Sequence, residues 1–155
     1  MSVLIRQAKA QDLADVLQLY AQPAMDNGQV LSLPAAEQQL AQFSLYPSYR
    51  LFVACEAHSD VPSSKGRVVG TYALLVMHNL AHQGTPSAIV EDVVVSAECQ
   101  SQGIGRAMMA HAMTQAREAG CYKLVLSSNQ KRERAHAFYE SLGFQRHGFS
   151  FQIEI

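Results

Sequence analysis

One segment limits the folds open to this chain more than any other: a β-branched run that leads through a glycine-rich turn into a long helix. Residues 89–95 are β-branched apart from Glu91 and Asp92, which predicts a buried strand. An Ala- and Met-rich helix is predicted over 103–119. The turn between them consists of Gln100, Ser101, Gln102, Gly103, Ile104, Gly105 and Arg106. A helix start leaves backbone N–H groups unpaired at the positive end of its dipole, so this turn could bind a phosphate group.

The bulk composition is that of one soluble folded domain spanning residues 1–155. Hydrophobic residues make up 48% of the chain and charged residues 16%. The 12 Lys and Arg residues nearly balance the 13 Asp and Glu residues, so nucleic acid is a poor candidate partner. The chain has no apolar run long enough to cross a membrane and no recognisable signal peptide, so we expect a cytoplasmic protein. Its three cysteines form no Cys-x-x-Cys pair and suit reduced thiols.

Hydrophobic spacing predicts alternating strands and helices along the rest of the chain. Strands are expected over 3–7, 50–56, 68–77, 89–95, 121–127, 144–147 and 149–155. Helices are expected over 12–20, from Pro34 to about Tyr46, over 103–119 and over 132–142. A polar connection, 58–67, joins the second and third strands. This order predicts an α/β fold in which helices cover a mixed sheet. The loop 22–33 is where we expect substrate-specific contacts.

A second motif lies in the predicted helix 132–142. It comprises Ala135, Phe138, Tyr139, Gly143 and Phe144. Alone, it is most simply an amphipathic helix with an aromatic core stripe. The glycine turn alone could equally be an ordinary turn, because it matches neither the dinucleotide fingerprint nor a Walker loop.

Together, in this order and at this separation, the two motifs resemble the GNAT superfamily of acyl-CoA-dependent N-acetyltransferases. The motif pattern is Gln100-x-x-Gly103-x-Gly105 followed by Ala135-x-x-Phe138-Tyr139-x-x-x-Gly143-Phe144. The resemblance runs from Val3 to Ile155. It implies a mixed, mostly antiparallel sheet of about seven strands, flanked by four helices, in which the central strands splay apart.

The resemblance also implies how acetyl-CoA, the co-substrate, would be held. Backbone amides from Gln102 to Arg106 would bind its pyrophosphate. The backbone of Val93, Val94 and Val95 would pair with the pantetheine arm, and 121–127 would form the other wall of that slot. Asn129 is a candidate polar contact to the pantetheine, and Tyr139 would lie near the thioester sulfur as general acid. No metal is implied.

The chemistry of amine acetylation requires a base as well as an acid. A free amine with a pKa near 10.4 is mostly protonated at pH 7, so a carboxylate base, acting directly or through water, is useful. We choose Glu91, because period-two alternation places it on the same face as Val93 and Val95, with Asp92 opposite. Asp92 is the reserve. Glu91 could instead be a structural carboxylate paired with Arg50 or Arg67.

Two subgroups of the family share features with this chain. Residues 90–96 and 120–124 resemble glucosamine-6-phosphate N-acetyltransferases, whereas the longer, basic stretch 127–134 resembles aminoalkylphosphonate and uncharacterised bacterial acetyltransferases. Sugar-phosphate specificity therefore does not carry over. Lys131, Arg132 and Arg134 could contact an anionic acceptor or the coenzyme 3′-phosphate, or form a solvated helix start.

We therefore expect an enzyme that transfers acetyl from acetyl-CoA to a primary amine of a small molecule, directly and in a ternary complex. Peptide or protein acetylation is the enzymatic alternative. A non-catalytic acyl-CoA-binding or sensing module is the alternative from another class, and a generic nucleotide or phosphate binder is a third. Dimerisation is common in the family, so a homodimer is compatible with the resemblance.

Overall fold

The computed structural model describes residues 2–56 and 66–155, so most of the predicted connection 58–67 lies outside the described residues. Two compact units are present, Met1–Val125 and Leu126–Ile155. The strands are β1 (Val3–Gln7), β2 (Tyr49–Glu56), β3 (Val68–Met77), β4 (Ser87–Val95) and β5 (Leu124–Leu126). The α-helices are α1 (Leu13–Tyr20), α2 (Leu33–Phe43), α3 (Ile104–Glu118) and α4 (Glu133–Ser141). Short 3-10 turns are η1 (Ala10–Asp12), η2 (His82–Gly84) and η3 (Ala97–Cys99).

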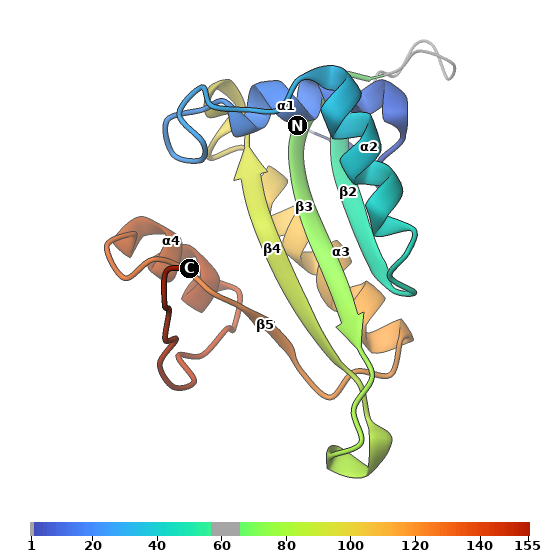
Figure 1. The fold of residues 1–155 in the computed structure, drawn as a ribbon. Helices are drawn as coiled ribbons and strands as arrows, with labels where there is room; N and C mark the ends of the chain where they lie inside the picture. Colours follow the sequence, from blue (N-terminus) through green and yellow to red (C-terminus); the bar gives the residue numbers. More distant parts are fainter. Residues whose placement is uncertain (1, 57–65) are drawn as a thin grey trace. The chain divides into compact units, whose positions relative to one another are not determined.

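The sheet has the order β1-β2-β3-β4-β5, and the first four strands pair antiparallel with their neighbours. Helix α3 covers one face of the sheet, and α1 and α2 lie over the other (Figure 1). Near the start of β4, Ala88 N donates a 3.0 Å hydrogen bond to Lys123 O, just before β5. The order of elements thus follows the predicted α/β arrangement.

Helix α3 packs closely on the sheet because β3 carries a glycine where the helix crosses it. A Cβ atom added to Gly70 would lie 2.8 Å from Met108 Sδ and 3.3 Å from Ile104 Cγ2. Ile104, Met108 and Met109 are themselves buried against the sheet. This contact fixes the start of α3, which is the part that follows the glycine-rich turn.

The opposite face of the sheet carries the main hydrophobic core. Val16 and Leu19 of α1 pack there with Val53 of β2, Ala73 of β3 and Val94 of β4. Alternation along β2 and β3 directs these residues to α1, while their neighbours point to α3. The helix predicted over 12–20 is present as α1, and its buried residues are Leu13, Val16 and Leu19.

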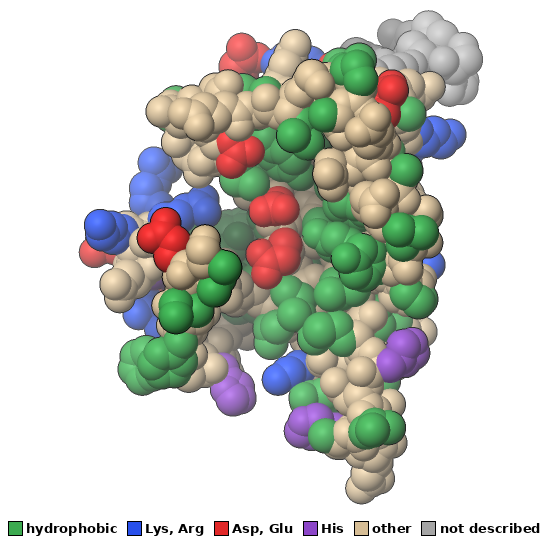
Figure 2. Space-filling view, in the orientation of Figure 1, with side chains coloured by type: hydrophobic (Ala, Val, Ile, Leu, Met, Phe, Trp, Pro, Cys, Tyr) green, Lys and Arg blue, Asp and Glu red, His purple; other side chains and the backbone are tan. Residues whose placement is uncertain are grey.

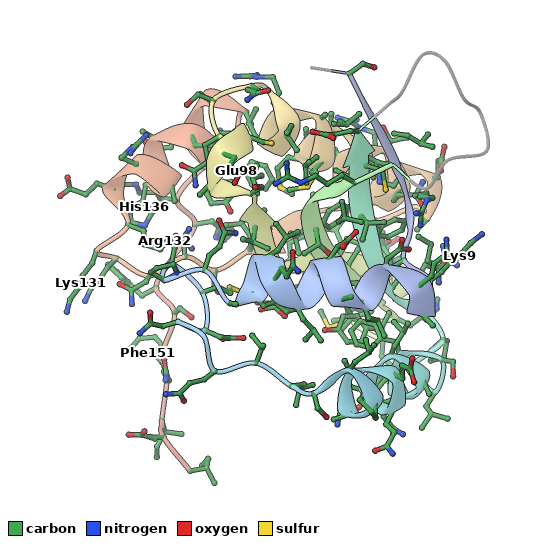
Figure 3. All side chains as sticks on the ribbon, turned by 90° about the horizontal axis from the view of Figure 1, so that it is seen from above. Lys9, Glu98, Lys131, Arg132, His136 and Phe151 are labelled. Atoms are coloured by element: carbon green, nitrogen blue, oxygen red, sulfur yellow. The ribbon has the colours of Figure 1, made fainter. Side chains whose placement is uncertain are left out.

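Two predicted strands at the end of the chain are wrong: residues 2–56 and 66–155 contain five strands, and none of them lies within 144–155. Phe149, Phe151 and Ile153 alternate with polar residues, the pattern that favoured a strand, yet they are 92%, 93% and 81% exposed. Figure 3 shows Phe151 on an extended segment at the end of the chain. Alternation predicts a strand only where a neighbouring strand pairs with it and a surface covers its apolar side, and the described residues provide neither.

A buried ion pair joins the first strand to the first turn. The Arg6 guanidinium donates two hydrogen bonds to the Asp12 carboxylate, at 2.7 and 2.9 Å, and Lys9 N donates a third at 2.8 Å. The Asp12 side chain is fully buried, whereas that of Arg6 is 26% exposed. Asp12 therefore depends on protein donors in place of water.

We expect Arg6→Met to lower the free energy of unfolding by about 3 kcal/mol, because it leaves a buried carboxylate without its counter-ion. Urea denaturation followed by circular dichroism measures the change. Arg67→Met is the control, since its ion pair with Glu98 is exposed and should contribute no measurable stability. Equal stability of the Arg6 variant and the wild type would contradict the assigned role of this pair.

Candidate active site

The glycine-rich turn adopts the backbone geometry that opens a helix toward an anion. Ser101 has φ 63°, and Gly103, the residue that caps α3, has φ 83°. The first helical hydrogen bond runs from Ala107 N to Gly103 O at 3.0 Å. Helix geometry therefore leaves the N–H groups of Gly103, Ile104 and Gly105 without an acceptor inside α3. These three belong to the amides, from Gln102 to Arg106, that the family resemblance predicts to bind the coenzyme pyrophosphate.

Glycine is required at 103 for its backbone angle and not for space. A Cβ added there would meet no atom within 4 Å. A left-handed φ of 83° is strained for residues with a side chain. A 3.3 Å hydrogen bond from Gln102 Nε2 to Glu98 O connects the turn to η3.

A β-bulge interrupts β4 at the predicted carboxylate pair. Ala73 of β3 pairs with Glu91 and Thr71 pairs with Val94, so two residues of β4 stand opposite one of β3. Asp92 takes the strained angle, with φ 52°. The expected alternation is therefore wrong: Glu91 shares the α1 face with Ala73 and Val94, not with Val93 and Val95. A bulge shifts the side-chain alternation by one residue, and that is what moves Glu91.

Asp92 lies on the same side of the sheet and lines a cleft of about 690 Å³ in the first unit. The other walls come from α1, the loop 22–33, α2 and the start of β2. Figure 2 shows acidic side chains in a hollowed part of this face, beside hydrophobic ones. The predicted substrate loop 22–33 contributes Asp26, Gln29, Val30 and Leu31 to the cleft.

Both carboxyl groups at the bulge hold their protons more tightly than ordinary side chains. Burial raises the pKa of Glu91, and the neighbouring Asp92 raises it further. Burial also raises the pKa of Asp92, with a second contribution from Asp26. A higher pKa makes a carboxylate a stronger base toward an ammonium group, provided that it is ionised at the working pH.

Two tyrosines, Tyr20 and Tyr49, line the same cleft as Asp26 and Asp92. Burial raises the pKa of Tyr20, and Asp92 adds to the shift. The pKa of Tyr49 is raised in the same way, by burial first and then by Asp92 and Glu91. Both phenols therefore remain protonated near neutral pH and can act as hydrogen-bond donors. Neither tyrosine was predicted as a site residue from the sequence, and Asp26 was included only as part of the loop 22–33.

The Gln22 side chain connects the end of α1, a helix that lines the cleft, to the end of β4. Its side-chain Oε1 accepts a 2.7 Å hydrogen bond from Ala97 N, and its Nε2 donates to Leu19 O at 3.0 Å and to Val95 O at 3.4 Å. One side chain thus joins the end of α1 to the end of β4. No sequence motif marks this glutamine.

Tyr139 and Asn129 belong to the second unit. The Tyr139 ring lies 5.2 Å from the Phe138 ring and 5.8 Å from the Phe144 ring, centroid to centroid. Burial raises the pKa of Tyr139, and Arg132 lowers it by a smaller amount. The phenol is therefore protonated at neutral pH, which is the form that a general acid needs.

Asn129 forms the turn that precedes α4. Its Oδ1 accepts a 2.9 Å hydrogen bond from Lys131 N, and its carbonyl oxygen lies 2.9 Å from His136 Nε2. Figure 3 shows Lys131, Arg132 and His136 together at this helix start. The Asn129 Oδ1 is thus used within the turn, so a contact to pantetheine remains a prediction for its amide N–H₂ group.

Other expectations concern metals, thiols and ion pairs. Over residues 2–56 and 66–155 there is no group of three or more potential metal ligands. Cys55, Cys99 and Cys121 are not joined by disulfides. Arg67 pairs with Glu98 and not with Glu91, which removes one structural explanation of that carboxylate. None of the helices in the described part of the chain has the length and apolar character of a membrane span.

The fold is thus a mixed sheet with helices on both faces. Its candidate site combines a glycine turn at the start of α3 with two carboxylates at a bulge in β4. The model of the acetyltransferase (GNAT) family matches residues 11–144. The chain belongs to this family.

Three relatives illustrate the match. Glucosamine 6-phosphate N-acetyltransferase of Trypanosoma brucei brucei is 32% identical over 90 residues, which are 58% of this chain and 59% of that protein. Aminoalkylphosphonate N-acetyltransferase of Salmonella typhimurium is 34% identical over 94 residues, 61% of this chain and 60% of that protein. The match therefore spans about three-fifths of each of these two relatives. A solved structure of a candidate acetyltransferase from Agrobacterium tumefaciens str. C58 is 32% identical, with a TM-score of 0.85, and the match covers 98% of this chain and 99% of that one.

Proposed function

We propose that the protein transfers the acetyl group of acetyl-CoA to a primary amine of a small molecule, directly and in a ternary complex. Family membership supports the reaction class, and the named relatives act on small amines. The observation that carries the proposal is the arrangement along β4: a bulge places Asp92 in the wall of a cleft directly after Glu91, and the same strand leads into the glycine turn.

The turn would bind the coenzyme through its backbone. The amides of Gly103, Ile104 and Gly105 fit the pyrophosphate, since hydrogen bonds to a charged acceptor contribute about 1.5–3 kcal/mol each. The backbone of Val93, Val94 and Val95 would then run beside the pantetheine arm. Gln100, Ser101, Gln102 and Arg106 remain proposed contacts of the coenzyme at this turn, as the family resemblance implies.

The reaction moves three protons: two leave the amine nitrogen, and one is added to the leaving thiolate. Glu91, directly or through water, takes a proton from the ammonium group, and the free amine attacks the thioester carbonyl. The new C–N bond forms as the C–S bond breaks. The leaving thiolate takes a proton from the Tyr139 hydroxyl, the second proton of the amine returns through solvent to the Tyr139 phenolate, and Glu91 releases its proton to solvent. The products are an amide and free coenzyme A.

Thiol release tests the overall reaction. The protein, acetyl-CoA and each member of a primary-amine library should yield free coenzyme A together with a product 42 mass units heavier than its amine, the mass of an added acetyl group. Release without any acetylated product would indicate hydrolysis instead. A protein that binds acetyl-CoA but acetylates no amine would contradict the proposal and favour the sensing module.

Replacing each of the two carboxylates should change the dependence of kcat/KM on pH in a different way. Glu91→Gln removes the base, so kcat/KM should fall about 100-fold and the acidic limb of the profile should disappear. Asp92→Asn removes a charge that raises the pKa of Glu91, so its acidic limb should move to lower pH. In the wild type this limb should lie above that of an ordinary carboxyl group, because activity is lost as pH falls through a raised pKa.

Glu37→Gln, an exposed position on α2, is the control and should behave as the wild type. If Asp92→Asn abolished the limb and Glu91→Gln only displaced it, the roles of the two residues would be reversed.

A further inference from the structure

The cleft on the α1 face of the first unit has apolar walls. Leu17 of α1, Leu31 of the loop and Leu40 of α2 line it. Its aromatic wall is a stacked pair, Phe43 and Tyr49, whose ring centroids lie 4.2 Å apart with the planes at 10°. A volume of about 690 Å³ lies within the range of small-molecule sites, about 300–1,000 Å³.

The charges of this cleft all have one sign. Asp26 and Asp92 line it, and among the described residues of its lining there is no lysine, arginine or histidine. Arg50 lines a neighbouring hollow of about 230 Å³ that shares Phe43 and Tyr49 with the cleft. Burial raises the pKa of Asp92 and the charge of Asp26 raises it further, so the two carboxylates repel each other when both are ionised. A bound cation would relieve this repulsion.

These features conflict with an anionic acceptor. A phosphate or phosphonate group would face two carboxylates with no cation in the lining, where the only side-chain donors are the neutral groups of two tyrosines and two glutamines. An ammonium group near Asp92 with a hydrocarbon or aromatic tail against the leucines matches both the charge and the walls. The cleft thus differs from what a sugar phosphate requires, although one relative is named for such a substrate.

We propose that the acceptor is an alkyl- or arylalkylamine: a primary ammonium group, placed by Asp92 and Asp26, on an uncharged apolar body that fills the cleft between α1 and α2. This inference rests on the proposed acetyltransferase function and names the substrate class of that site. Leu31, Leu40 and the Phe43–Tyr49 stack are its specificity-determining residues.

Matched amines test the proposal. With acetyl-CoA, 2-phenylethylamine and hexylamine should give kcat/KM values at least tenfold above those of phosphoethanolamine and glucosamine 6-phosphate. Binding of the same amines, measured by calorimetry in the presence of coenzyme A, should follow the same order. A preference for the phosphorylated amines in both measurements would overturn the proposal while leaving the acetyltransferase function intact. Tight binding of 2-phenylethylamine without turnover would support the cleft assignment and contradict the function.

A single cation in the wall should reverse the preference. Leu31 is 49% exposed, so Leu31→Arg should fold normally. It should raise the KM for 2-phenylethylamine about tenfold and lower that for phosphoethanolamine, whereas Leu31→Met should leave both near wild type. Unchanged selectivity in Leu31→Arg would overturn the assignment. The assignment would also be overturned by a second pair of results. The wild type would acetylate phosphoethanolamine efficiently, and combined replacement of Lys131, Arg132 and Arg134 by alanine would abolish that activity.

Discussion

Replacing Tyr139 by phenylalanine is expected to lower kcat by about 100- to 1,000-fold and to change the Kd for acetyl-CoA less than threefold. General acid catalysis contributes about 10²–10⁴-fold, and the variant loses only the hydroxyl that supplies the proton. The ring remains, so the contacts with Phe138 and Phe144 are kept. A phenol can protonate a thiolate with a pKa near 8.5 at modest cost. Single-turnover kinetics with excess enzyme measure the chemical step.

The control for this experiment is Tyr46→Phe. Tyr46 is an exposed tyrosine of the first unit, and its edge-to-face ring contact with Tyr49 does not need the hydroxyl. This variant should turn over as the wild type does. A Tyr139 variant that also did so would remove the phenol from the mechanism.

The second large effect concerns the glycine turn. Gly105→Asp should weaken acetyl-CoA binding about 100-fold, because a carboxylate about 5 Å from a diphosphate costs about 3 kcal/mol at an effective dielectric constant of about 20. The helix itself should tolerate the change, since an acidic side chain in the first turn interacts favourably with the dipole. Isothermal titration calorimetry gives the two dissociation constants.

Gly105→Asn separates charge from size at the same position. It has nearly the same volume and no charge, so its affinity should lie within tenfold of the wild type. Equal losses in the Asp and Asn variants would mean that steric exclusion, and not a bound diphosphate, explains the effect.

The parts of the fold that the sequence predicted depend on local signals. Strand β3 begins and ends at the predicted residues, 68 and 77, and α3 begins one residue later than expected. β-Branched runs, a proline in the first turn of α2 and a glycine at a left-handed cap determine such elements from their own residues. The glycine turn was visible for the same reason.

The parts that were missed depend on contacts between distant segments. The bulge at Asp92 has no local signature, although aspartate adopts a left-handed φ more readily than most residues. The cleft brings together α1, a loop, α2 and two strands, and periodicity along any one of them cannot show it. The C-terminal alternation failed because the pairing partner that a strand requires is not specified by its own sequence.

The central claim is that backbone amides at the start of α3 bind the pyrophosphate of acetyl-CoA. Its most direct test is a titration of acetyl-CoA into ¹⁵N-labelled protein, followed by the amide signals of Gly103, Ile104 and Gly105. We expect these amide signals to shift together and to saturate with the Kd found by calorimetry. The same signals should shift far less with ATP. Saturable binding of acetyl-CoA that leaves all three amides unchanged would contradict it.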